Sequence, residues 1–220
     1  MNEIHGLYAN IKMLEQEDLF RHFLCELSTE RQQKIEALRT QTGRLHSLGA
    51  WTLLDRLLAD HMGVHERELE IAVGAHRKPY VVGRADIQFN LSHSGDYVLA
   101  VLAPVEVGCD IQHVEKTGRE EQLAARFFTA EEQEAYASGA GFYRIWARKE
   151  SWIKCDGRGM SQDLRSFSVV ADGQCSSRIA GRHFAELRLD GYEMAVCYAG
   201  AGGYPVRVVE AAIDRIVTMW

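Results

Sequence analysis

The sequence of 220 residues is poor in proline and has no long hydrophobic run. With only three prolines, a proline-rich disordered segment is not expected. No apolar stretch approaches the ~20 residues that a membrane-spanning helix needs. The first residues, MNEIHGLYANIK, lack the basic and apolar parts of a secretory signal. We therefore expect a compact cytoplasmic protein that has no membrane partner.

Cysteine is scarce and irregularly placed. The five residues form no CxxC pair and are Cys25, Cys109, Cys155, Cys175 and Cys197. Their odd number argues against a disulfide framework, and their spacing argues against a zinc site. We expect reduced thiols that are mostly buried or unreactive.

Positive charge is also in short supply, because 25 Lys and Arg residues face 31 Asp and Glu residues, for a formal net charge of −6. General nucleic-acid binding needs a basic field, so we expect no nucleic-acid partner. Local basic clusters can still hold a small phosphorylated ligand. The 46% of hydrophobic residues and the length suit one large domain or two lobes.

Two helices are predicted between Ser28 and Asp60. STERQQKIEAL opens with helix-capping residues, and SLGAWTLLDRLLAD has apolar residues at helical spacing. From Ile87 the period changes, and IQFNLSHSGDYVLAVLAPVEVGCDIQ predicts an antiparallel meander of three strands, broken at HSGD and APVE. In the third strand, alternation puts Asp110 and Gln112 on one face. The opposite face would carry Val107, Cys109 and Ile111.

The second half repeats the order of helices followed by strands. A helical pattern runs over 119–137, with Thr129 as a cap, and another helix surrounds Trp146 to Lys154. SFSVV, FAELRL, YEMAVCY and PVRVV then read as strands. The change of pattern near 103–106 predicts an α+β fold of two lobes, 1–105 and 106–220, with a small-molecule site in the cleft between them.

The segment FYRIWARKESWIKCDGRGMS, residues 142–161, combines charge with aromatic residues. Glu150 and Lys154 are spaced i and i+4, so they share one face of the predicted helix, one turn after Trp146. An ordinary surface ion pair is the simplest interpretation of this spacing.

Three segments converge on one signature: FNLSHSGD with His93, VGCDIQ with Asp110, and WARKESWIK with Glu150 and Lys154. In this order, together with STERQQK, SLGAWTLL, RKP at 77–79, ARFFTAEE, SFSV and GYEMAVC, they resemble the phosphopantetheinyl transferases of the larger, two-lobed, surfactin-synthetase-activating type. The resemblance covers most of the chain. It implies two similar α+β lobes in a pseudo-two-fold relation, with the active site in the cleft between them.

The activity implied by this resemblance is transfer of the 4′-phosphopantetheine arm of coenzyme A to a serine of an acyl or peptidyl carrier protein. Such carriers serve fatty-acid, polyketide and nonribosomal peptide synthesis, and 3′,5′-ADP is the product that leaves. Phosphoryl transfer needs mainly positioning and charge neutralisation from the protein. We expect an enzyme that acts as a monomer.

The resemblance also implies a magnesium ion on the diphosphate, with Asp110, Glu150 and position 112 as ligands. Many members have a second acid at that position, where this chain has Gln112, whose amide oxygen brings no charge. Glu150 is the expected base and Lys154 the expected partner of the diphosphate, so Asp110, Glu150 and Lys154 form the catalytic set. The glycine-rich stretch around Arg158 either covers the same region or simply ends the helix.

Coenzyme A would be bound at further matching positions. Those implied for the 3′-phosphate are Arg31, Lys34, Ser47 and His93, and those near the adenine are Lys78, Pro79 and Ser92. Arg31 and Lys34 are spaced i and i+3, which suits a two-point phosphate clamp but equally suits a solvated basic face.

Three alternatives stay open at this stage. Phe127 and Phe128 would either dock the carrier protein or belong to the core. Gln112 leaves room for a noncatalytic module that binds coenzyme A or a carrier protein. A metal-dependent phosphohydrolase would use the same acids, but it gives no reason for the HSGD and RKP segments.

Overall fold

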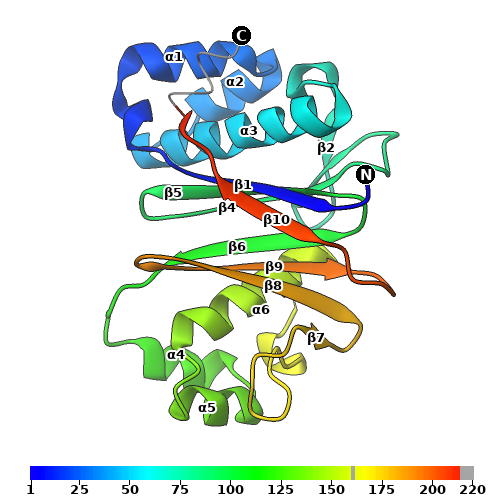
Figure 1. Ribbon diagram of the computed structural model, residues 1–220. Helices are drawn as coiled ribbons and strands as arrows, with labels where there is room; N and C mark the ends of the chain where they lie inside the picture. Colours follow the sequence, from blue (N-terminus) through cyan, green and yellow to red (C-terminus); the bar gives the residue numbers. More distant parts are fainter. Residues whose placement is uncertain (160–161, 214–220) are drawn as a thin grey trace. The chain divides into compact units, whose positions relative to one another are not determined.

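The computed structural model describes residues 1–159 and 162–213. The fold is α+β, as predicted, and the chain forms two compact units (Figure 1). Unit 1 comprises Met1–Ala72, Pro79–Pro104 and the chain from Tyr204 onward. Unit 2 comprises Val73–Lys78 and Val105–Gly203. The expected division into 1–105 and 106–220 differs from these units in two segments, because 73–78 lies in unit 2 and the chain from Tyr204 lies in unit 1.

Unit 1 is a four-stranded sheet in the order β10-β1-β5-β4, with three helices on one face (Figure 1). Strand β1 is antiparallel to β5 and parallel to β10, and β5 is antiparallel to β4. The strands are β1 (Ile4–Asn10), β4 (Gln88–Ser94), β5 (Tyr97–Ala103) and β10 (Val206–Glu210). The helices are α1 (Glu17–Glu26), α2 (Thr29–Glu36) and α3 (Gln41–Met62), with 3-10 turns η1 (Lys12–Glu15) and η2 (Glu66–Glu68).

Local sequence signals fix the ends of the unit 1 helices. The Ser28 side chain accepts a hydrogen bond from the Arg31 backbone N–H at the start of α2. Thr40 caps α3 in the same way, and α3 ends at Gly63, whose φ of +64° suits glycine. The apolar side of α3 then packs on the sheet in a core that includes Leu48, Leu53, Leu57, Phe89, Val98, Ala100 and Leu102.

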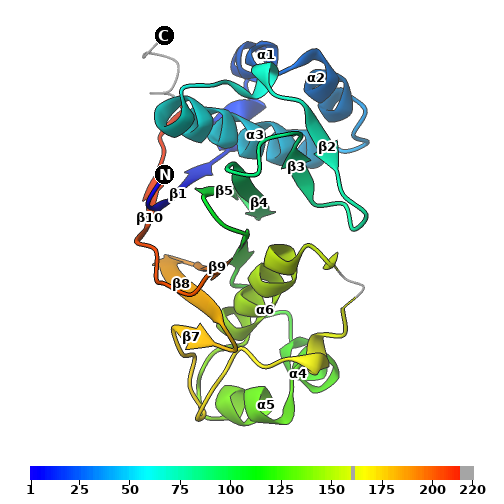
Figure 2. The ribbon, with the colours of Figure 1, turned by 90° about the vertical axis from the view of Figure 1, so that its right-hand side faces the viewer.

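Unit 2 is built on a four-stranded antiparallel sheet in the order β6-β9-β8-β7, again with helices on one face (Figures 1 and 2). The strands are β6 (Val107–His113), β7 (Arg178–Ile179), β8 (Arg182–Leu189) and β9 (Tyr192–Ala199). The helices are α4 (Glu120–Phe127), α5 (Ala130–Ala137) and α6 (Phe142–Asp156), followed by η4 (Leu164–Ser166). A separate two-stranded ribbon joins β2 (Ile71–Val73) to β3 (Pro79–Val81) (Figure 2).

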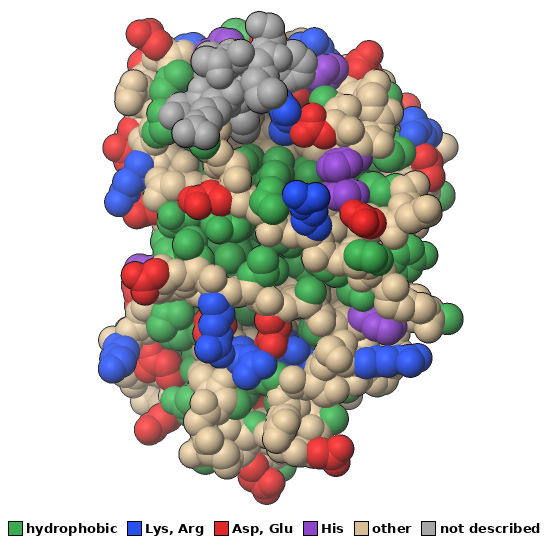
Figure 3. Space-filling view, in the orientation of Figure 1, with side chains coloured by type: hydrophobic (Ala, Val, Ile, Leu, Met, Phe, Trp, Pro, Cys, Tyr) green, Lys and Arg blue, Asp and Glu red, His purple; other side chains and the backbone are tan. Residues whose placement is uncertain are grey.

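The surface of the protein carries charges of both signs. On the face that Figure 3 shows, acidic and basic side chains of the described residues are interspersed rather than gathered in one large field of a single sign. Within the part of the chain that the structure describes, no helix is both long and apolar enough to cross a membrane. All five cysteines are free thiols, and burial raises the pKa of Cys109 to about 12.

The predicted three-stranded meander is wrong in its third strand. β4 and β5 form the expected hairpin, but β6 pairs with β9 instead of β5. The chain leaves the first sheet after Ala103, at the Pro104 break, and enters unit 2. PVRVV does form a strand, β10, but this strand joins β1 in unit 1. Such pairings connect distant parts of the sequence, so local pattern did not reveal them.

The predicted strand SFSVV, residues 166–170, is also wrong. Val169 and Val170 are buried, which explains the apolar signal, but they belong to no strand. The backbone N–H of Val169 instead donates to the Glu132 carboxylate at 2.8 Å. Glu132 also completes the capping box with Thr129, which confirms the predicted start of α5.

Helix α6 lies unusually close to β6 because of a glycine. A Cβ added at Gly108 would lie 2.1 Å from the Ser151 carbonyl oxygen and 2.3 Å from the Cys155 backbone nitrogen. Both atoms belong to the backbone of α6, which cannot yield as a flexible side chain would. Glycine therefore permits the helix to approach this strand.

We predict that Gly108→Ala destabilises the protein by at least about 2 kcal/mol, since α6 must move away from the sheet. Thermal or denaturant unfolding measures the loss. Gly202→Ala is the matched control, because a Cβ there meets nothing within 4 Å. Equal stability of the two variants would contradict the close contact.

Candidate active site

Strand β6 places Asp110 and Gln112 side by side, which confirms the predicted alternation. The Gln112 Nε2 atom donates to Asp110 Oδ2 at 2.7 Å. Helix α6 covers this same face, so the Lys154 Nζ atom reaches Asp110 Oδ1 at 2.6 Å. Asp110 is only 2% exposed. Its two carboxylate oxygens thus each accept one hydrogen bond from these neighbours.

Lys154 forms its ion pair across to the strand, with Asp110, rather than as a simple pair along the helix surface. Burial lowers the pKa of Lys154, but the charge of Asp110, with smaller contributions from Cys109 and Glu150, outweighs this and raises it. The amine is therefore held in its charged form, which is the form that stabilises phosphate oxygens.

Glu150 lies one turn before Lys154 and is half-buried. Burial, and then the negative charge of Asp110, raises the pKa of the Glu150 carboxyl, while Lys154 opposes the shift. Within residues 1–159 and 162–213, Glu150 makes no hydrogen bond or ion pair. The Glu150 carboxyl is thus influenced by both the Asp110 carboxylate and the Lys154 amine.

The Lys78 side chain is bound by two backbone carbonyl groups of unit 2. Its amine donates to the carbonyl oxygens of Val107 at 2.9 Å and Cys155 at 3.0 Å, so it ties the 73–78 loop of unit 2 to β6 and α6. Burial lowers the pKa of Lys78. The side chain therefore connects this loop to β6 and α6.

Arg31 and Lys34, both on α2, have separate surroundings in unit 1. The Arg31 guanidinium lies over the Trp51 ring, 3.4 Å from its centroid, and its Nε lies 3.5 Å from the buried Glu66 carboxylate. The Lys34 amine pairs with Glu30 at 2.5 Å on the exposed side of α2. Arg31 is thus held in place, and Lys34 is available at the surface.

Three further expected residues lie on neighbouring elements of unit 1. Ser92 is buried and His93 is exposed, both on β4 rather than in the turn that follows. Ser47 is half-buried on α3, and Pro79 begins β3, where its missing N–H is harmless. The ring of His93 stacks on His46, with 4.3 Å between centroids.

Sequence reasoning missed the residues that support these side chains. His46 precedes the matched Ser47, and Trp51 lies one turn further along α3, so both positions were within reach of a helical-wheel argument. Glu66 is 2% exposed and accepts hydrogen bonds from the backbone and side chain of Ser28. Nothing in the sequence around Glu66 signals this long-range contact.

The aromatic pair at the end of α4 divides between core and surface. Phe128 is fully buried and stacks on Phe142, so it belongs to the core. Phe127 is half-buried against Trp146, with Arg126 over its ring. Only Phe127 retains area for a partner.

The glycine-rich stretch after α6 does end the helix. Gly157 is the C-terminal cap, with a left-handed φ of +67°, and Arg158 is exposed. Met160 and Ser161, at the end of GRGMS, lie outside the described residues.

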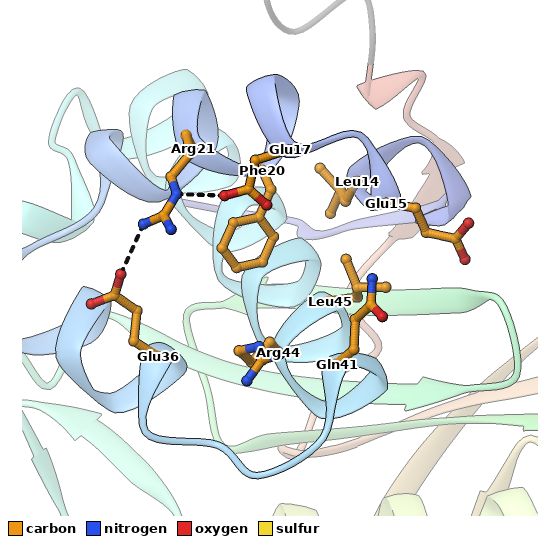
Figure 4. A pocket seen from close by; sticks show the side chains of 9 residues that line it. All are labelled: Leu14, Glu15, Glu17, Phe20, Arg21, Glu36, Gln41, Arg44 and Leu45. Carbon is orange, nitrogen blue, oxygen red and sulfur yellow. Dashed lines mark hydrogen bonds and ion pairs between the residues drawn. The ribbon is translucent and has the colours of Figure 1, made fainter.

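A hollow of about 280 Å³ on unit 1 contains none of the expected site residues (Figure 4). Its rim carries Arg21, which pairs with Glu17 at 2.8 Å and Glu36 at 3.1 Å. The remaining lining residues are Leu14, Glu15, Phe20, Gln41, Arg44 and Leu45. Three glutamates against two arginines make this hollow a poor site for a phosphate.

Comparison with known proteins identifies the family of the chain. Residues 106–197 match the family described as 4′-phosphopantetheinyl transferase superfamily, and residues 15–105 match 4′-phosphopantetheinyl transferase, N-terminal. The chain therefore belongs to the 4′-phosphopantetheinyl transferase superfamily.

Its relatives are of the Sfp type. The chain is 28% identical over 215 residues to 4′-phosphopantetheinyl transferase Sfp of Bacillus subtilis, covering 90% of this chain and 92% of that protein. It is 33% identical over 165 residues to 4′-phosphopantetheinyl transferase psf-1 of Bacillus pumilus, covering 66% of this chain and 70% of the relative.

We predict that Glu150→Gln raises the melting temperature of the metal-free protein by about 1 to 3 °C at neutral pH. A carboxyl whose pKa is raised in the folded state destabilises that state once the pH exceeds its ordinary value, and glutamine removes the charge. Calorimetry with a chelator present measures the change. Glu134→Gln, on the exposed side of α5, is the control. A lower melting temperature for Glu150→Gln alone would show that Glu150 is stabilised rather than strained by its surroundings.

Proposed function

We propose that the protein transfers the 4′-phosphopantetheine arm of coenzyme A to a serine of an acyl or peptidyl carrier protein and releases 3′,5′-ADP. The carrier would serve fatty-acid, polyketide or nonribosomal peptide synthesis. The observation that carries the proposal is the convergence of Asp110, Glu150 and Lys154 in a chain of this family. We propose further that it acts as a cytoplasmic monomer, without a nucleic-acid or membrane partner.

The donor set of unit 2 fits a magnesium ion. The Asp110 and Glu150 carboxylates lie close enough for the charge of Asp110 to raise the pKa of Glu150. A divalent cation would offset the repulsion between them. In the described part of the chain, no group of three or more His, Cys, Asp or Glu side chains is placed to hold a metal. Magnesium suits such a sparse set, because it commonly binds one or two carboxylates together with substrate phosphates and waters.

Asp110 and Glu150 would hold this ion, and Gln112 would complete the set through its amide oxygen. When bound, magnesium neutralises charge on the diphosphate oxygens. For Gln112 to act as a ligand, its amide must turn the oxygen toward the ion, whereas its nitrogen now donates to Asp110. If a water lies between Gln112 and the ion, the amide oxygen can bind that water while the amide nitrogen keeps its hydrogen bond to Asp110.

The remaining chemistry is assigned to side chains of α6. The Glu150 carboxylate accepts the proton of the carrier serine as its oxygen attacks the phosphorus that bears the pantetheine arm. The bond between this phosphorus and the leaving 3′,5′-ADP oxygen breaks, and the positive charge of Lys154 stabilises the oxygens there. The pair Asp110 and Lys154 keeps the amine charged before substrate binds.

Side chains of unit 1 are assigned to the other end of coenzyme A. Arg31, Lys34, Ser47 and His93 would hold the 3′-phosphate, and Pro79, Ser92 and the backbone of Lys78 would lie near the adenine. The structure supports Arg31 best, because its guanidinium is fixed by Trp51 and Glu66 and so loses little freedom on binding.

A noncatalytic module that binds coenzyme A or a carrier protein is the alternative. It would give no reason for a half-buried Glu150 placed against Asp110. Phe127 remains a proposed contact for the carrier, since part of its ring is exposed next to Arg126.

Mass spectrometry of a carrier protein incubated with coenzyme A, magnesium and this chain tests the function. We expect the carrier to gain the mass of the phosphopantetheine arm. Asp110→Ala and Glu150→Ala should each reduce the rate by at least about 100-fold while the protein stays folded. Binding of coenzyme A without any mass gain would favour the noncatalytic module. Undiminished transfer by both variants would reject the catalytic assignment.

Gln112→Glu should lower the magnesium concentration needed for half-maximal activity, because it adds a charged oxygen beside Asp110. The same change should destabilise the metal-free protein by about 1 kcal/mol. The new carboxylate would repel Asp110, whereas the Gln112 amide donates a hydrogen bond to it. Magnesium titrations of activity and thermal melts with and without magnesium measure both effects. Gln112→Ala is the control and should raise the midpoint modestly. If the Glu variant is destabilised but its magnesium midpoint is unchanged, residue 112 does not belong to the metal site.

A further inference from the structure

His46 is a buried residue of α3 that touches the β4–β5 hairpin of unit 1 in two ways. Its Nε2 atom lies 2.7 Å from the carbonyl oxygen of Gly95. A carbonyl only accepts, so Nε2 must carry a proton. The ring also stacks on that of His93, with 4.3 Å between centroids and 17° between planes.

The turn of this hairpin is fixed from a second side as well. The Asp96 carbonyl oxygen accepts from the Ile11 backbone N–H at 2.9 Å, and the Asp96 carboxylate pairs with Lys12 at 2.7 Å. Gly95 has a φ of +54°, which glycine adopts without strain. The backbone that carries His93 is therefore held in place on both sides of the turn.

Fixing one rotamer of a side chain when a ligand binds costs free energy. A ring stacked against it selects one orientation in advance. The Trp51 ring orients the Arg31 side chain in the same way, because the guanidinium lies over it. Helix α3 thus supplies one aromatic ring to each of two side chains that are assigned to the same phosphate.

We propose that His46 is a positioning residue that orients His93 toward the 3′-phosphate of coenzyme A. The inference rests on the proposed function, in which His93 contacts that phosphate. His46 itself touches no reacting group. It increases the affinity for ligands that carry a 3′-phosphate and leaves the affinity for the same ligand without this phosphate unchanged.

The test is the ratio of the dissociation constants of 3′-dephospho-coenzyme A and coenzyme A, measured by calorimetry with the full chain and magnesium. His46→Gln keeps a donor for Gly95 but loses the ring, and should weaken coenzyme A by up to about ten-fold, with dephospho-coenzyme A unchanged. His46→Phe keeps a stacking ring and should retain most of the affinity. Because both ligands are measured on one protein, partial unfolding cancels from the ratio.

His61→Gln is the matched control, since His61 is also on α3 and stacks on His5, with 3.7 Å between centroids. It should leave the ratio unchanged. Equal weakening of both ligands by His46→Gln, or no weakening, overturns the proposal.

A double-mutant cycle with His93→Ala separates this proposal from the one it rests on. His93→Ala should lower the ratio by itself, and adding His46→Gln should then have no further effect on it. A further loss in the double mutant would show that His46 does not act through His93. An unchanged ratio in His93→Ala would instead overturn the assignment of His93 to the 3′-phosphate, and the role of His46 with it.

Discussion

The close contact between α6 and β6 at Gly108 determines where the candidate catalytic groups lie. Without a side chain at this position, the helix backbone meets the strand directly, and Lys154 comes within 2.6 Å of Asp110. Glu150, one turn earlier, is brought under the influence of the same carboxylate. A site of this kind needs residues on two rigid elements at a fixed separation, and the glycine sets that separation.

The opposite side of α6 is held by a buried ion pair. The Lys149 amine contacts both oxygens of Glu132 at 2.7 Å and the Phe167 carbonyl at 3.0 Å, and both charged side chains are fully buried. Glu132 also binds the N–H of Val169, so a single carboxylate connects α5, α6 and the 166–170 segment. Burying this ion pair costs desolvation free energy. In return, the Lys149–Glu132 contact restricts how α5 and α6 can pack against each other.

The sequence predicted those features that depend on neighbours along the chain. Strand alternation placed Asp110 beside Gln112, helical spacing placed Glu150 near Lys154, and Thr129 marked the start of α5. The pairing of β6 with β9 and of β10 with β1 could not be read in this way, since the paired residues are at least 79 positions apart. The strand prediction for segment 166–170 failed for a related reason. The distant Glu132 carboxylate accepts the hydrogen bond of the Val169 backbone N–H, which would otherwise go to a neighbouring strand.

The parallel pairing of β1 with β10 has a consequence for the order in which the chain folds. As the ribosome releases the polypeptide, β1 emerges before the other described strands, and its outer partner β10 emerges after them. Almost all of unit 2 is a continuous stretch, Val105–Gly203, and lies between them in the sequence. Unit 2 can therefore reach its native structure during synthesis, whereas the sheet of unit 1 must wait with one edge of β1 unpaired, which leaves that strand open to pairing with other nascent chains.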